Sequence, residues 1–257
     1  MPIDLIVDGP VAKVVINRPE KLNALSWDMR EALIKHFNEL RYDNSIRAII
    51  VTGGGKVFCS GADVERMDKQ DLLAARERTQ RGGHAMIRAL HAIEKPVIAA
   101  VRGVAVGIGW SIALACDIII ASETARFSQI YRKVGLVPDG GACWFLMRLL
   151  GMARAKELFF SARFVHAPEA LTLGLVNHVV RDDELMAKAE ALARDYADGP
   201  TFTFGMGKKL MHMAAGPSLE DFLEFECMVQ PQMNQTVDHH EGVAAFKEKR
   251  KPKFHGR

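Results

Sequence analysis

Short runs of β-branched and apolar residues recur through most of the chain. Four of these runs predict strands, at residues 11–17, 47–52, 97–101 and 117–121, and those at 47–52 and 97–101 are expected to be buried. Between them, apolar side chains recur at helical spacing. This spacing predicts a helix that Ser26 caps and that covers residues 29–40, and further helices at 71–94, 107–115 and 140–150. The alternation of strands and helices predicts an α/β fold with helices packed on the sheets.

The pattern changes in the last third of the chain, because no strand signal follows Asp183. Ser218-Leu-Glu-Asp is a capping box, and it predicts an amphipathic helix that extends to about Met233. We therefore predict an α/β core at residues 1–195 and a helical section at residues 196–257.

Composition narrows the class of protein further. The chain has 257 residues, 49% of them hydrophobic and 25% charged, which is typical of one large globular domain. Its four cysteines have no metal-ligand spacing, so we expect reduced thiols and no metal site. The N-terminus has no signal-peptide pattern, and the longest uncharged stretch, 103–116, is too short to cross a bilayer. We expect a cytoplasmic protein without a membrane partner.

The net charge of +3 is unevenly distributed, because the last residues are strongly basic. Two interpretations remain open for this tail, a solvated surface or a contact with an anion such as phosphate. The basic side chains, set against Glu248 alone, are Lys247, Lys249, Arg250, Lys251, Lys253 and Arg257.

Three glycine-rich turns are the candidate functional elements. Two of them, at residues 59–63 and 103–109, are suited to presenting backbone N–H groups to an oxyanion. The second leads into a predicted helix, whose first N–H groups lack partners within the helix. The third, Pro-Asp-Gly-Gly, contains Asp139, the one acidic residue between 131 and 142. Taken alone, the glycines are equally well explained by packing. Without further context, Asp139 is explained by turn formation.

Seven motifs follow one another along the chain: NRPEKLNAL (17–25), VFCSGADV (57–64), KPVIAAVRGVAVGIG (95–109), ACDIIIA (115–121), ARFSQ (125–129), GLVNHVV (174–180) and EGVAAFKEKR (241–250). Together and in this order, they resemble the enoyl-CoA hydratase/isomerase (crotonase) superfamily. This resemblance implies a spiral of ββα turns at 1–195, which binds CoA and carries the chemistry, and a helical trimerisation region at 196–257. It also implies an acyl-CoA thioester substrate, no cofactor apart from the CoA of the substrate, and a homotrimer or a hexamer built from two trimers.

The resemblance also assigns the site residue by residue. The oxyanion hole would be the N–H groups of Ala62 and Ile108, with Ile108 at a position where the family usually has glycine. Gly107 would let the substrate carbonyl approach the backbone. The CoA contacts would come from Lys21, Ala24, Ser60, Gly61, Asp63 and Val64, and from Phe246 and Lys249 of the same or a neighbouring subunit's tail.

The carboxylates distinguish between the reactions of this superfamily. Hydratases of the family use two glutamates, and the matching positions here are Ser111 and Tyr131. Asp139 stands where isomerase branches, such as the Δ3,Δ2-enoyl-CoA and phenylacetate-pathway ring isomerases, have their single acid. One carboxylate beside a thioester held by two N–H donors is suited to moving a proton from C2 to C4. The sequence thus favours a one-acid acyl-CoA isomerase.

Other interpretations remain open. His84 lies where 4-chlorobenzoyl-CoA dehalogenases have a catalytic histidine, so an Asp/His dehalogenase or hydrolase is an alternative, and a core or cleft histidine is another. Tyr131 is expected either to line the acyl pocket or to donate a hydrogen bond. A hydratase-type lyase and a non-catalytic CoA- or RNA-binding protein complete the alternatives, although nucleic acid is not an expected partner.

Overall fold

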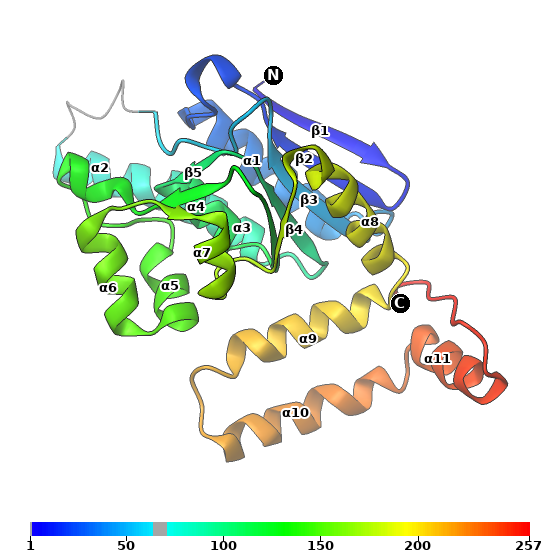
Figure 1. The fold of residues 1–257 in the computed structure, drawn as a ribbon. Helices are drawn as coiled ribbons and strands as arrows, with labels where there is room; N and C mark the ends of the chain where they lie inside the picture. The colour runs from blue at the N-terminus through cyan, green and yellow to red at the C-terminus, as the bar shows by residue number, and fades with distance from the viewer. Residues whose placement is uncertain (1, 64–70) are drawn as a thin grey trace.

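The fold is built around a six-stranded sheet with the strand order β1-β2-β3-β4-β6-β9. A computed structural model describes residues 2–63 and 71–257 of the chain (Figure 1). β1 pairs antiparallel with β2, and the remaining neighbours pair in parallel. The strands are β1 (Ile3–Asp8), β2 (Val11–Ile16), β3 (Ala48–Gly53), β4 (Val97–Val101), β6 (Ile118–Ser122) and β9 (His178–Val180).

A second, three-stranded sheet has the order β5-β7-β8. Its strands are β5 (Val104–Val106), β7 (Arg126–Ser128) and β8 (Val165–His166). The four strands expected from apolar runs are confirmed to within one residue at each end as β2, β3, β4 and β6. β1 was not predicted. The two- and three-residue strands were also not predicted, because so few residues cannot show a period of two.

The helices of the core follow the strands as the alternating pattern predicts. The helix expected at 71–94 contains a π-helical segment, Thr79–His84, between α2 and α3 and ends at His91. Ser26 caps α1 through a hydrogen bond that its Oγ accepts from the N–H of Met29 (3.4 Å). The helices are α1 (Trp27–Tyr42), α2 (Leu72–Arg78), α3 (Ala85–His91), α4 (Ile108–Leu114), α5 (Ala142–Leu150), α6 (Met152–Ser161), α7 (Ala167–Thr172) and α8 (Leu185–Ala197).

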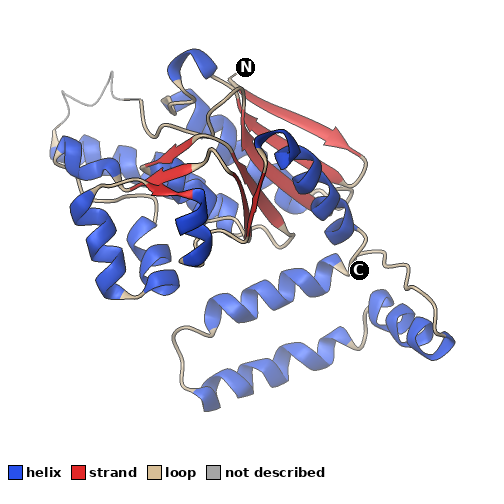
Figure 2. Ribbon diagram, in the orientation of Figure 1, coloured by secondary structure: helices blue, strands red, loops and turns tan. Residues whose placement is uncertain are grey.

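Both faces of the large sheet are covered by helices (Figure 2). In β3, Ile49 and Val51 belong to the core that also includes α1 and α4, while Ile50 points to the opposite face. That opposite face packs against α8, whose alanines allow the helix to approach the strands closely. The alternation along β3 explains why the strand reads as a continuous apolar run rather than as alternating residues.

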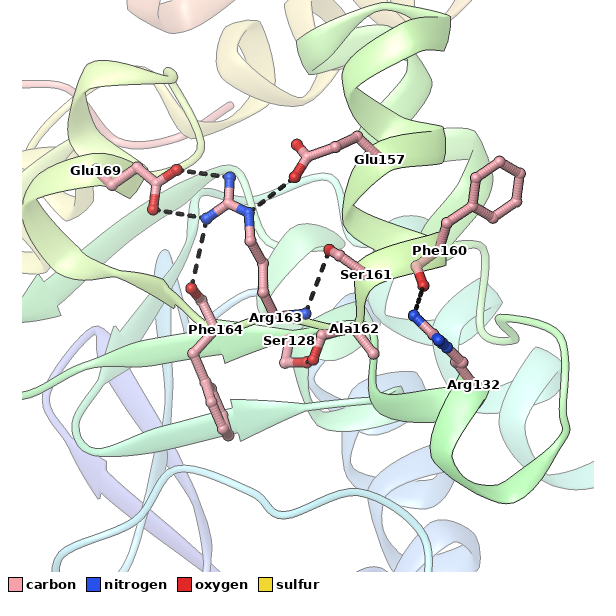
Figure 3. A network of polar contacts seen from close by, with 9 residues as sticks. All are labelled: Ser128, Arg132, Glu157, Phe160, Ser161, Ala162, Arg163, Phe164 and Glu169. Atoms are coloured by element: carbon pink, nitrogen blue, oxygen red, sulfur yellow. Dashed lines mark hydrogen bonds and ion pairs between the residues drawn. The ribbon is translucent and has the colours of Figure 1, made fainter.

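Arg163, which lies in the chain between α6 and β8, joins α6 to α7 near the second sheet (Figure 3). Its guanidinium donates to Glu157 of α6 (2.9 Å) and to both carboxylate oxygens of Glu169 of α7 (2.7 and 2.9 Å). Close by, Arg132 donates to the carbonyl of Phe160, which attaches the turn Ile130–Val134 to α6. The Arg132 bond therefore anchors the turn that contains Tyr131 to α6.

Three helices form the C-terminal section, α9 (Thr201–Met213), α10 (Leu219–Met233) and α11 (Val237–Glu248). Ser218 caps α10 as predicted, by accepting from the N–H of Asp221 (3.2 Å). Lys208 docks α9 on the core through bonds to the Ile93 carbonyl (2.7 Å) and to Asp117 (2.7 Å). The division of the chain at residue 195 stays a prediction, and α8 runs across it to Ala197.

Candidate active site

Two of the predicted glycine turns lie side by side. Cys59 pairs with Ala105, and its carbonyl accepts from the N–H of Val106 (3.1 Å). Gly61 has a φ of +102°, and a β-carbon there would lie 3.2 Å from the Val106 carbonyl oxygen. Both the backbone conformation and the close approach require glycine at this position.

This pairing brings Ala62 and Ile108 into adjacent turns. Gly107 has a φ of +55° and turns the chain from β5 into α4, so that Ile108 becomes the first residue of the helix. Within the ranges 2–63 and 71–257, neither the Ala62 nor the Ile108 N–H donates a hydrogen bond. Both donors are thus available to an acceptor between the two turns, which is the geometry an oxyanion hole needs.

Asp139 lies at the same turn and is held from two sides. The Tyr131 hydroxyl donates to its Oδ1 (2.6 Å), and the Ser111 hydroxyl donates to its backbone carbonyl (3.0 Å). The following residue, Gly140, packs on the start of α4, since a β-carbon there would lie 3.2 Å from Cγ1 of Ile108. The half-buried carboxylate is therefore fixed next to a predicted oxyanion donor.

Tyr131 is a buried hydrogen-bond donor rather than only a pocket wall. Burial, and next the negative charge of Asp139, raise the pKa of the Tyr131 hydroxyl above its ordinary value. The phenol thus keeps its proton and donates a hydrogen bond to the Asp139 carboxylate. A β-carbon at Gly107 would lie 3.8 Å from the Tyr131 Oη, which places this hydroxyl against the turn that opens α4.

His84 is the last residue of the π-helical segment and is half-buried. In the described part of the chain, no hydrogen bond joins its imidazole to Asp139 or Tyr131. A catalytic role for His84 stays a prediction. The π-helical segment contacts the site through Gly83 instead, because a β-carbon at Gly83 would lie 2.9 Å from Cδ1 of Ile108.

The residues predicted to contact CoA near the N-terminus lie together. Lys21 ends the short turn Pro19–Lys21 and is exposed, and its carbonyl accepts from the Ser60 hydroxyl (3.5 Å). The Ser60 N–H donates to the Leu22 carbonyl (3.1 Å). These contacts join the first motif of the chain to the turn that carries Gly61 and Ala62.

Asp63 is held by Arg18, which joins the same two segments. The Arg18 guanidinium lies 2.6 Å from the Asp63 carboxylate and also donates to the carbonyl of Ala24 (3.3 Å). Asp63 therefore supports the turn, whether or not it also contacts CoA. Val64, also predicted to contact CoA, lies outside the described residues.

Phe246 and Lys249 lie far from these turns within one chain. Both are at the C-terminal end of α11, which follows α10 in the helical section outside the α/β core (Figure 1). The Phe246 side chain is 85% exposed, and Lys249 ends the helix with a φ of +55°. Contact of these two residues with CoA, from the same chain or from a neighbouring subunit, stays a prediction.

Arg30 was missed by sequence reasoning and lies beside the site. Its side chain is only 7% exposed, and its Nε is buried without a hydrogen-bond partner. Burial lowers the pKa of the Arg30 guanidinium, and the carboxylate of Asp139 is the largest opposing influence. A signal was present in the sequence, because Arg30 precedes Leu33 by three residues and Phe37 by seven, which places it on the apolar face of α1.

The described residues show neither a candidate metal centre nor a candidate membrane-spanning helix. Among residues 2–63 and 71–257, no three His, Cys, Asp or Glu side chains are grouped so that they could hold a metal ion. Over the same ranges, no helix combines the length and the apolar character that crossing a bilayer requires.

The chain matches known proteins over nearly its whole length. The family model described as enoyl-CoA hydratase/isomerase matches residues 7–257. One curated relative, 1,2-epoxyphenylacetyl-CoA isomerase of Escherichia coli (strain K12), is 35% identical over 98% of this chain and 97% of its own length. Another, short-chain-enoyl-CoA hydratase of Clostridium acetobutylicum, is 38% identical over 95% of this chain and 94% of its own length.

The fold agrees with these matches. The crystal structure of enoyl-CoA hydratase from Bacillus anthracis superposes with a TM-score of 0.94 at 30% identity, and the match covers 100% of both chains. Relatives named isomerase and hydratase are about equally similar, so the matches establish the family rather than one activity. The chain belongs to the enoyl-CoA hydratase/isomerase (crotonase) superfamily and has its fold.

Proposed function

We propose that the protein is an acyl-CoA isomerase that moves a double bond with Asp139 as its single acid–base group. One observation carries this proposal. The two residues at the positions of the hydratase glutamates, Ser111 and Tyr131, both bond Asp139, one at its carbonyl and the other at its carboxylate. In a hydratase, the residues at these two positions would activate water. Here they hold Asp139 in place instead.

The reaction follows from this arrangement. The Asp139 carboxylate removes a proton from C2 of a 3-enoyl-CoA, and the electron pair of the C–H bond moves onto the thioester oxygen. The N–H groups of Ala62 and Ile108 stabilise the resulting enolate. Asp139, now protonated, returns the proton to C4 as the double bond moves to C2–C3, so that atoms and charge balance without an added reactant.

The names of the relatives are consistent with either branch of the family. The Escherichia coli relative is named as an isomerase and the Clostridium acetobutylicum relative as a hydratase. Hydration requires a base that positions and activates water. Neither a serine nor a tyrosine whose pKa is raised can provide a carboxylate base at these positions, and this supports the isomerase.

The test is mass spectrometry of 3-enoyl-CoA and 2-enoyl-CoA after incubation with the wild type and with Asp139→Asn, which keeps the shape of the side chain. We expect the wild type to shift the double bond without a change of mass, and the variant to lose this activity. Gain of one water by the 2-enoyl thioester in the variant would overturn the proposal. Circular dichroism of both proteins controls for folding.

The same proposal includes the assembly and setting of the enzyme. CoA enters as part of the substrate, no separate cofactor takes part, and the protein acts in the cytoplasm as a homotrimer or a pair of trimers. Exposed apolar side chains on the C-terminal helices support self-association, and light scattering after gel filtration measures it. They include Met211 (76% exposed), Leu219 (68%), Met228 (64%) and Phe246 (85%).

A further inference from the structure

Arg30 is an unusual residue for the interior of a protein. A guanidinium that is 7% exposed is normally surrounded by acceptors, because removing a charge from water without partners is costly. No hydrogen bond or ion pair of its side chain is found within residues 2–63 and 71–257. Its five N–H donors are therefore available to a ligand.

The surroundings of Arg30 connect it to the reacting centre. The π-helical segment Thr79–His84 packs against it, since a β-carbon at Gly82 would lie 3.4 Å from Cδ and 3.5 Å from Nη1 of Arg30. The next residue, Gly83, contacts the side chain of Ile108, whose N–H belongs to the proposed oxyanion hole. One wall of glycines thus contacts both the guanidinium and the oxyanion turn, and π-helical segments occur frequently at functional sites.

The guanidinium of Arg30 itself favours an anionic ligand. The groups that act on the guanidinium most strongly are the negative Asp139 and the positive Arg78. The Arg30 guanidinium keeps its positive charge at neutral pH, and its Nε is buried without an acceptor. A carboxylate entering this region would find a planar donor whose geometry suits bidentate binding.

We propose that Arg30 recognises the acyl group of the substrate by binding a carboxylate at the end of the chain distant from the thioester. The proposal rests on the isomerase function above and makes it specific, because the substrate class becomes an enoyl-CoA derived from a dicarboxylic acid. A buried arginine without a partner is then explained, since the substrate supplies the partner.

The test uses saturated thioesters in matched pairs of equal chain length: succinyl-CoA with butyryl-CoA, glutaryl-CoA with pentanoyl-CoA, and adipoyl-CoA with hexanoyl-CoA. Calorimetry measures the affinity ratio of each pair. In the wild type we expect the carboxylate-bearing ligand to bind about tenfold or more tightly at one length or more, the ratio that a charge-assisted hydrogen bond gives. In Arg30→Met, which nearly preserves volume, we expect that ratio to fall to about one, while the control Arg163→Met retains it.

Two results would overturn the proposal. The first is that the wild type shows no preference for the carboxylate-bearing ligand at any chain length, a result that does not depend on the folding of a variant. The second is that the preference survives in Arg30→Met. Saturated thioesters contain no double bond to move, so this outcome is independent of the isomerase proposal. A protein that binds the carboxylate through Arg30 but shifts no double bond would overturn the reaction alone.

Discussion

Arg163 and Arg30 show how differently one side chain is used in two regions of the same molecule. Arg163 lies near the surface with its side chain 38% exposed, and it bonds the carboxylates of Glu157 and Glu169 (Figure 3). Hydrogen bonds from Glu169 and then Glu157 raise the pKa of its guanidinium. For Arg30 the shift has the opposite sign, because burial dominates and no carboxylate bonds it.

The difference indicates what each arginine is for. A structural arginine, such as Arg163, has its donors occupied in the folded chain, and its bonds join α6 to α7. An arginine that is buried with unused donors destabilises the free protein, and such a feature persists where function requires it. Arg163 thus stabilises the fold, whereas the donors of Arg30 are available to bind a ligand.

The largest expected effect comes from removing the negative charge of Asp139. In Asp139→Asn, the isomerase kcat should fall by about 10²–10⁴-fold, the range typical of a lost general acid–base group. The side chain is only half-buried and keeps its shape, so the melting temperature should change little. A variant that unfolds more readily but keeps its kcat would show that Asp139 is a turn residue after all.

Tyr131→Phe should have the next largest effect. It removes the 2.6 Å hydrogen bond to the Asp139 carboxylate while leaving the ring in place. Because bonds to charged groups are worth about 1.5–3 kcal/mol, kcat should fall about 10–100-fold through loss of positioning. Ser111→Ala, which removes only a bond to the Asp139 backbone, is the matched control and should cost less. Equal losses in both variants would contradict the special role of the phenol.

The two arginines should respond to the same substitution with opposite signs. Arg163→Met should lower the free energy of unfolding by about 1 kcal/mol, since exposed ion pairs are weak even in networks. Arg30→Met should raise it by about 1 kcal/mol, because an unpartnered buried charge is replaced by an apolar group of similar size. Urea unfolding of the ligand-free proteins measures both. A clear loss of stability in Arg30→Met would mean that the guanidinium has a structural partner.

How far the sequence predicts this molecule differs between its parts. The strands β2, β3, β4 and β6 were predictable because continuous apolar runs have a direct physical meaning in a buried sheet. The site depended on resemblance, since nothing in the spacing of Asp139 and Tyr131 predicts that their side chains meet. Arg30 was missed because a charge on an apolar face is normally attributed to the helix boundary or to solvent.

His91 shows how a half-buried base differs from a buried arginine. It stacks on His212 of α9 with the ring centroids 4.0 Å apart. Burial, and next the charges of His212 and Lys208, lower the pKa of His91 from 6.5 to about 4. Unlike Arg30, which remains charged, His91 responds to burial by losing its proton.

The pH dependence of stability follows from this sign. Neutral His91 is favoured in the folded state, so its contribution is complete above pH 6.5 and is lost as the pH falls towards 4. We expect a loss on the order of 1 kcal/mol, below the full linkage value because the half-buried ring is partly screened by water. Urea unfolding at several pH values between 4 and 7.5 measures it, and His91→Gln should give a flatter profile. An equally steep profile in that variant would assign the acid sensitivity to other groups, such as His212, whose pKa burial also lowers.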